Sequence, residues 1–351
     1  MTVEDNRNTG KDRAALDFGT KLLHFGSEID KTTGASSVPI YQASTFHHHD
    51  IFNPPVHDYS RSGNPTRQAL EDYIALLEGG VQGFAYASGM AAISSSFMML
   101  SAGDHIIVTE DVYGGTYRLL TTILSRMNIE TTFVDMTDLD QVKSAYRSNT
   151  KAVYMETPSN PTLKITDIAA VTAWAKEHGL ITFLDNTFMT PYYQRPLELG
   201  VDIVLHSATK FLGGHSDVLA GLAVARTEEL AKELKRLQNG LGTVLGAQES
   251  WLLMRGMKTL EARMVHSEKS TARLAKWLSQ RSDITAVYYP GLASHPGRDI
   301  HERQSSGYGA VVSFDVGSGE RAKQVLNKVR LPIVAVSLGA VESILSYPTM
   351  M

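Results

Sequence analysis

The stretch VDIVLHSATKFLGG, residues 201–214, joins a short apolar run to a polar turn that ends in two glycines. An apolar run of this length, bounded by turn residues, is typical of a strand buried on both faces. Segments that favour helices, such as residues 116–127, separate similar runs, which span residues 83–87, 105–109, 131–134, 152–155 and 180–184. This alternation predicts an α/β fold with a mostly parallel sheet covered by helices.

The composition places the chain among globular proteins and excludes several functions. Hydrophobic residues make up 43% of the 351 residues and charged residues 20%, the usual balance for a folded protein. The net charge of −4 provides no basic field for nucleic acid or for an anionic membrane. The absence of cysteine excludes disulfides, thiolate zinc sites and cysteine nucleophiles.

Targeting signals and metal motifs are also not expected. Residues 1–17 are polar and charged, unlike a secretory signal, and no apolar run reaches the roughly 18 residues that span a bilayer. We therefore expect a cytoplasmic protein. The tract His47-His48-His49 is not expected to bind a metal, because adjacent side chains point in different directions and only Asp50 is close in sequence as a further ligand.

The chain divides into three parts by its patterning. Residues 1–62 contain little periodicity, and long aperiodic stretches in compact proteins are often functional or pack on a partner chain. Residues 63–257 carry the alternation of strands and helices. Residues 258–351 begin with long charged helical segments and continue with strands, which predicts a smaller α+β domain. That domain stops at SYPTMM, directly after a strand-like run, so we expect it to be incomplete.

Polar turns follow four of the predicted strands, and ligands bind at the carboxyl ends of strands in open parallel sheets. Gly89 opens a helix at one turn, where backbone N–H groups favour an anion, although a glycine used only for packing fits as well. Lys210, flanked by Ser207 and Thr209, follows another strand and is by itself compatible with a surface lysine. Asp185 ends a third strand, where helix capping is the commonest use of an acidic residue.

The fourth turn, ETPSNPT, holds Asn160 between two prolines in a rigid loop. Together the four turns supply an anion cradle, a carboxylate, an amide and a lysine beside two hydroxyls. Pyridoxal phosphate needs a lysine for a Schiff base, an anion that keeps the ring nitrogen protonated, and a clamp for its phosphate. The combination therefore predicts a pyridoxal-phosphate site, which no single turn predicts.

Six motifs in a fixed order resemble those of the Cys/Met-metabolism pyridoxal-phosphate enzymes: SGMAAI, DVYGGTYR, ETPSNPT, FLDNTF, HSATKFLGGHSDV and SLGAVESILSYP. This family comprises cystathionine lyases and synthases of aspartate-aminotransferase-like fold, which is pyridoxal-phosphate fold type I. The resemblance runs from about residue 20 to the last residue. Within the family, the sequences of these motifs are most similar to those of bacterial cystathionine β-lyases.

The resemblance implies a role for each matching residue. Lys210 would carry the cofactor and act as general base, with Tyr113 and Tyr59 as the other catalytic residues. The implied cofactor contacts are Gly89, Met90, Tyr113, Asn160, Asp185, Ser207, Thr209 and Lys210, with Tyr59 and Arg61 reaching in from a neighbouring subunit. The implied substrate contacts are Tyr113, Asn160, Ser337 and Leu338.

The resemblance also implies an assembly and an activity. A site shared between subunits implies a homotetramer built from two active dimers. The implied reaction is α,β-elimination of L-cystathionine to homocysteine, pyruvate and ammonia. A cystathionine γ-lyase or γ-synthase is the alternative within the family, and a catalytically silent pyridoxal-phosphate-binding protein is the alternative from a different class.

One feature of the family lies beyond the last residue of this sequence. Family members continue past SYP to an R-[LI]-S-x-G motif whose arginine binds the substrate carboxylate, whereas the sequence ends at Met351. We expect a longer protein, because a strand-rich domain should not fold well without its last elements. Glu342, which follows the SLG motif, is compatible with both β- and γ-chemistry and does not separate them.

Overall fold

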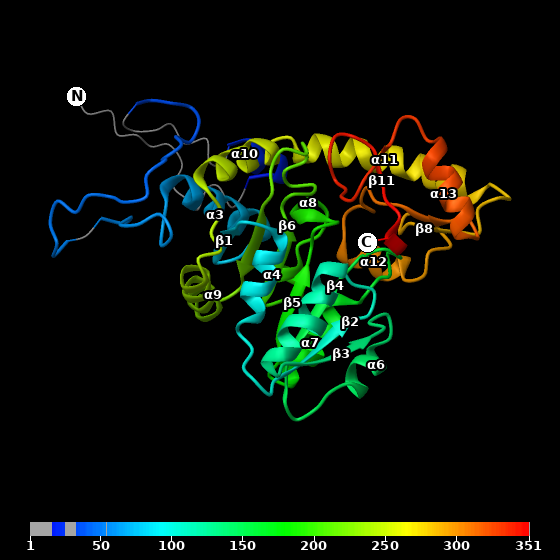
Figure 1. Ribbon diagram of the computed structural model, residues 1–351, viewed down its shortest axis with the longest axis horizontal. Coiled ribbons are helices and arrows are strands. Elements are labelled where there is room, and N and C mark those ends of the chain that lie inside the picture. The colour runs from blue at the N-terminus through cyan, green and yellow to red at the C-terminus, as the bar shows by residue number, and fades with distance from the viewer. Residues whose placement is uncertain (1–15, 25–32, 54, 351) are drawn as a thin grey trace.

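The computed structural model describes residues 16–24, 33–53 and 55–350, and a seven-stranded sheet forms its centre (Figure 1). The strand order is β1-β7-β6-β5-β4-β2-β3, and within this sheet only β7 runs antiparallel to its neighbours. The prediction of a mostly parallel sheet is confirmed. The strands are β1 Gln82–Tyr86, β2 His105–Thr109, β3 Glu130–Val134, β4 Thr150–Glu156, β5 Ile181–Asp185, β6 Ile203–Ser207 and β7 Gly221–Ala225.

Helices cover both faces of this sheet. On one face α4 and α9 pack on the strands, and on the other α3, α7 and α10 enclose a second cluster. None of the helices in the described ranges has the length and apolar composition needed to cross a membrane. The α-helices are α2 Phe18–His24, α3 Pro65–Glu78, α4 Gly89–Phe97, α5 Gly114–Arg118, α6 Leu139–Ser144, α7 Ile168–Glu177, α8 Thr190–Tyr193, α9 Glu228–Leu241, α10 Ala247–Met257, α11 Leu260–Ser279, α12 Arg298–Gln304 and α13 Gly319–Lys328.

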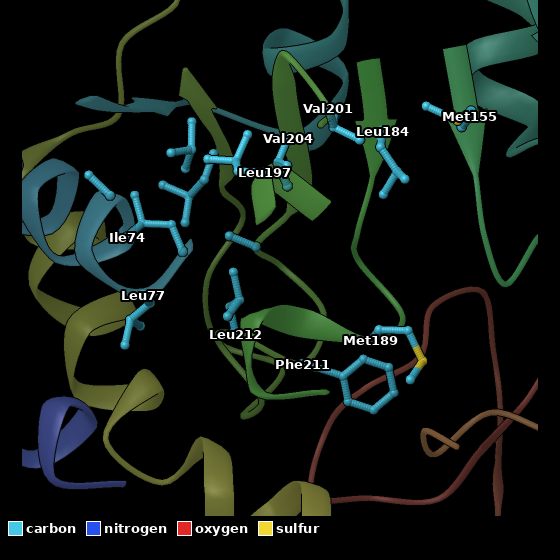
Figure 2. Packing of buried hydrophobic residues seen from close by; sticks show 14 of the residues in the cluster. Ile74, Leu77, Met155, Leu184, Met189, Leu197, Val201, Val204, Phe211 and Leu212 are labelled. Carbon is cyan, nitrogen blue, oxygen red and sulfur yellow. The ribbon is translucent and has the colours of Figure 1, made fainter. Parts of the chain in front are cut away.

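The central strands are continuously apolar because each face packs against its own cluster. In β4, Ala152 and Tyr154 belong to the cluster under α4, whereas Val153 and Met155 belong to the cluster under α3. Figure 2 shows part of the second cluster, in which side chains of the strands pack against those of α3. Burial on both faces fixes the register of the strands, so the residue that ends each strand is held in a defined place.

Two features of the sheet region differ from the patterns read in the sequence. Residues 116–127 are helical as predicted, but they do not form one regular α-helix, because α5 ends at Arg118 and a π-turn and a 3₁₀-turn follow. Thr121 and Thr122 donate their hydroxyls to carbonyls four residues earlier (2.8 and 2.6 Å), which competes with regular helix bonding. Strand β7 was not expected, because its sequence GLAVA has low strand propensity; all five residues are buried between β1 and β6.

Past α10 the chain forms the smaller α+β part that the sequence predicts. Strand β8, Ala286–Tyr288, pairs antiparallel with β9, Ser313–Asp315, and β10, Ile333–Val334, pairs parallel with β11, Ile344–Leu345. These strands gather with α12 and α13 around α11 on one side of the molecule (Figure 1). The boundaries read from the sequence, at residues 62/63 and 257/258, stay predictions.

One buried and one half-buried cation hold the segment before α3 against the body of the protein. Arg67 in α3 donates from Nη1 to the carbonyl of Ser60 (2.7 Å) and from Nη2 to that of Arg61 (3.2 Å). Lys235 in α9 donates to the carbonyl of Ser62 (2.6 Å). Glu71, one turn after Arg67, lies 3.5 Å from its Nε, and both side chains are 2% exposed. The segment that carries Tyr59 is therefore fixed at its base.

Replacing Arg67 by alanine should lower the free energy of unfolding by about 3–5 kcal/mol, because Glu71 would stay buried without its cation. The double variant Arg67→Met/Glu71→Leu should lose much less, since it removes both charges and keeps the volume. Urea denaturation of the two proteins measures the difference. A loss below about 1 kcal/mol in Arg67→Ala would contradict the structural role of this pair.

Candidate functional site

A cavity of about 850 Å³ opens at the carboxyl ends of β4, β5 and β6, beside the start of α4. The C-terminal part lines its other side with residues of β8, β9, α13 and β11. All the site residues predicted to act within one subunit line this cavity: Gly89, Met90, Tyr113, Asn160, Asp185, Ser207, Thr209, Lys210, Ser337 and Leu338.

The start of α4 forms an anion cradle at this cavity. Ser88 caps the helix by accepting the N–H of Ala91 (3.0 Å), whereas the N–H groups of Gly89 and Met90 have no partner within the described ranges. A Cβ on Gly89 would lie 2.8 Å from Ser207 Cβ and 3.0 Å from its Cα, so only glycine lets the helix approach β6 this closely. Two N–H groups and a hydroxyl therefore meet where a phosphate is favoured.

Lys210 follows β6 and reaches the same cavity from the turn after the strand. Its Nζ donates to Ser337 Oγ of the C-terminal part (2.8 Å). Burial lowers the pKa of Lys210, which increases the share of neutral, nucleophilic amine near pH 7. The hydroxyl of the neighbouring Thr209 accepts the N–H of Ala220 (3.0 Å) and lies 3.2 Å from its carbonyl oxygen. Lys210 is thus held in a defined orientation with a reactive amine.

Ser337 has a φ of 123°, which lies in the region that favours glycine, and this places its hydroxyl beside Lys210. Replacing Ser337 by alanine should lower kcat about tenfold, because a hydrogen bond that orients the amine is lost. Ser279→Ala is the matched control, since that hydroxyl lies outside the cavity and donates to the carbonyl of Lys276 (2.9 Å). Equal kcat values in the two variants would contradict the orienting role of Ser337.

Asp185 ends β5 as a buried carboxylate that has no cation bonded to it within the described ranges. Its Oδ1 accepts the N–H of Thr187 (2.9 Å), and the hydroxyl of Tyr154 lies 3.4 Å from Oδ2. Burial raises the pKa of Asp185, so the ionised form needs a positive partner. A cationic group of a ligand, such as a protonated ring nitrogen, would supply that partner. Together with the anion cradle and Lys210, this carboxylate fits pyridoxal phosphate.

Tyr113 and Asn160 come from two loops that meet at the cavity. Tyr113 is 39% exposed, and its N–H donates to Oε2 of Glu156 (3.0 Å). Glu156 itself lines the cavity, although the sequence patterns gave it no role. Its place at the end of β4, equivalent to that of Asp185 at the end of β5, is the signal that could have identified it.

Tyr59 and Arg61 lie outside this cavity. Arg61 Nη1 donates to the carbonyl and to Oδ1 of Asn239 (2.8 and 2.9 Å), and its guanidinium carbon lies 5.6 Å from the centre of the Tyr59 ring. The blue segment before α3 extends away from the sheet in Figure 1. The predicted role of this pair in the site of a neighbouring subunit stays a prediction.

The side chains that the sequence patterns set aside lie elsewhere. His206, in β6, is buried with its Nε2 2.6 Å from Glu78 Oε1, and it is not among the residues that line the cavity. Glu342 accepts the hydroxyl of Ser216 (3.2 Å) and is not among the residues that line the cavity. The rings of His47 and His49 lie 4.6 Å apart, and the described ranges contain no group of three histidines or carboxylates suited to a metal.

Comparison with protein families gives one match that covers most of the chain. Residues 19–351 match the model of the family described as Cys/Met metabolism PLP-dependent enzyme. Two relatives from Bacillus subtilis each cover 95% of this chain. Cystathionine beta-lyase MetC is 59% identical over 332 residues, which are 85% of its length, and cystathionine gamma-lyase is 50% identical over 88% of its length.

A solved structure supports the same relationship. The cystathionine gamma-lyase of Lactobacillus plantarum, crystallised with L-serine, is similar to this chain with a TM-score of 0.94 and 48% identity. The similarity covers 96% of this chain and 88% of that one. Identity at this level shows a shared fold, and it extends through both the sheet and the C-terminal part.

Proposed function

The chain belongs to the Cys/Met-metabolism family of pyridoxal-phosphate-dependent enzymes, and from this premise we propose that it is a cystathionine β-lyase. It would cleave L-cystathionine, with one water, to homocysteine, pyruvate and ammonia. One observation carries the choice of β- over γ-chemistry: within one organism, the identity to a β-lyase is 59% and that to a γ-lyase is 50%.

The proposed cofactor contacts follow from the geometry of the cavity. The N–H groups of Gly89 and Met90 and the hydroxyl of Ser207 would hold the phosphate, and Asp185 would pair with the ring nitrogen. Tyr113 would lie against the ring. When bound, the cofactor supplies an electron-accepting ring that stabilises the charge left on the substrate Cα after a bond there breaks.

Lys210 would move the protons of the reaction. With its amine free, Lys210 would be placed to remove the proton from the substrate Cα as general base. Burial lowers its pKa and the bond to Ser337 orients it, and both properties support this role. The same amine, once protonated, would return its proton to the leaving sulfur of homocysteine.

The arm of residues 1–62 would complete the site of a second subunit in a homotetramer of two active dimers. Its described part presents apolar side chains to solvent: Phe52 is 86% exposed and Val56 is 95% exposed. Such side chains are expected to be covered in an assembly. Tyr59 would take part in catalysis there, and the planar guanidinium of Arg61 would bind the cofactor phosphate with two hydrogen bonds.

We propose two further properties on the same premise. Residues 63–257 would form the cofactor-binding domain, with residues 258–351 as the second domain, because the cavity lies between these two parts. The enzyme would work in the cytoplasm, where free amino acids are the substrates of such reactions. Ser337 and Leu338 of the second domain would contact the substrate.

The products formed from L-cystathionine test the proposed activity. The full chain, loaded with pyridoxal phosphate, is incubated with L-cystathionine, and the keto acid is identified by mass spectrometry. We expect pyruvate with homocysteine. 2-Oxobutyrate with cysteine would assign γ-lyase chemistry instead, and cofactor binding without any keto acid would indicate a synthase or a silent binder.

A further inference from the structure

Two carboxylates join the loops that carry Tyr113 and Asn160, and each reaches from its own loop to the other. Glu156, at the start of the Asn160 loop, accepts the backbone N–H of Tyr113 (3.0 Å). Asp111, two residues before Tyr113, reaches in the opposite direction. Its Oδ2 accepts the hydroxyl of Ser159 (2.5 Å) and both the N–H (3.0 Å) and the hydroxyl of Thr162. The relative position of the two loops therefore depends on these two side chains.

Glu156 has an environment unlike that of a surface acid. It is 6% exposed, lines the cavity and is the register partner of Asp185 on the neighbouring strand. The acidic groups around it are Asp185 from β5, Asp111 from the loop after β2, and Tyr154 from β4. No lysine or arginine side chain hydrogen-bonds to it within the described ranges. Two carboxylates so close and so buried do not both carry a charge readily.

We propose that Glu156 is a positioning residue: as a hydrogen-bond acceptor without a required charge, it fixes Tyr113 against the cofactor ring and leaves the single negative charge to Asp185. Burial first, and the neighbouring Asp185 second, raise the pKa of Glu156 well above its usual range, which agrees with an uncharged acid. Hydrogen bonds from the backbone of Tyr113 and Asn160 act in the other direction on the same carboxyl. The proposal rests on the proposed cofactor site. It goes further because it names Glu156 as the side chain that sets the position of Tyr113.

Glu156→Gln and Glu156→Ala test the proposal in the full chain. Glutamine keeps an acceptor for the Tyr113 N–H but cannot carry a charge. Because the proposal requires only the acceptor, the dissociation constant of the Glu156→Gln protein for pyridoxal phosphate should stay within about threefold of that of the original protein. Alanine removes the acceptor, and the dissociation constant should rise about tenfold or more. Amide hydrogen exchange of the peptide 110–118, measured without cofactor, should be faster in the alanine variant only.

Asp111→Ala provides a second variant, because Asp111 is less buried and its loss threatens folding less. It should weaken cofactor binding through the same pair of loops, so its effect and that of Glu156→Ala should be less than additive. Glu130→Ala is the matched control. That side chain is a carboxylate that pairs with Arg147 (2.7 Å) on the surface, outside both loops and outside the peptide 110–118, and its removal should change neither quantity.

Three outcomes would overturn the proposal. The first is unchanged cofactor affinity and unchanged exchange in Glu156→Ala. The second is a glutamine variant as damaged as the alanine variant, which would show that the charge is required. The third is equal effects of Glu130→Ala and Glu156→Ala. These readouts need no turnover, so a chain that binds pyridoxal phosphate but forms no pyruvate would refute the proposed activity and leave this test intact.

Discussion

Replacing Lys210 by alanine should lower kcat for L-cystathionine cleavage by about 10⁴-fold, the largest effect of any single change in the chain. The substitution removes both the amine proposed to hold the cofactor and the base proposed to move the Cα proton. The anion cradle at α4 and the carboxylate of Asp185 remain, so the variant should still bind pyridoxal phosphate without a covalent bond. Keto-acid formation and absorption spectroscopy measure the two properties separately.

Two further variants show whether the effect belongs to the cavity. Lys210→Arg keeps a cation of similar length but cannot act as a neutral base near pH 7, so it should be as inactive as the alanine variant. Lys176→Ala removes an exposed lysine of α7 and should leave turnover unchanged. A Lys210→Ala protein that retains a tenth or more of the original kcat would refute the proposed mechanism.

Asp185→Asn should lower kcat by roughly 10³-fold, the second largest effect. The substitution keeps the shape of the side chain and its bond to the N–H of Thr187, but it removes the charge that would hold the ring nitrogen protonated. Losing one member of a buried ion pair costs about 3–5 kcal/mol. Since 1.36 kcal/mol corresponds to a factor of ten in rate, this cost lowers kcat by roughly 10²- to 10⁴-fold, which includes the expected 10³-fold.

The absorption spectrum of the bound cofactor and the kcat of Asp185→Asn check this prediction together. Asp202→Asn is the control, because that carboxylate bonds to Thr182 and pairs with Arg226 away from the cavity. A variant at Asp185 that turns over within threefold of the original would show that the ring nitrogen needs no negative partner in this protein.

The order of the strands along the chain could largely be predicted, because a strand buried on both faces has an uninterrupted apolar sequence. β2 and β4 stand out in this way. β7 could not be found in the same way, since its small residues form a strand only between two neighbours that bury it. The sequence of residues 116–127 predicts one helix. In the structure the helix changes type within this range, where threonine hydroxyls bond to backbone carbonyls. The sequence pattern does not predict these bonds.

Most of the site could be predicted because its side chains stand where strands end, a position that turn residues mark in the sequence. Lys210 and Asp185 are of this kind. The bond between Lys210 and Ser337 joins residues 127 positions apart, and the link between Glu156 and Tyr113 joins residues 43 positions apart. Such contacts depend on how the sheet and the C-terminal part come together, which local patterns do not contain.

Identification of the lysine that carries the cofactor tests the central claim most directly. The full chain is loaded with pyridoxal phosphate, reduced with borohydride so that the link between cofactor and amine becomes permanent, and digested for peptide mass spectrometry. The account predicts one modified residue, Lys210, in near-stoichiometric yield. Modification of a different lysine, or of none, would contradict it.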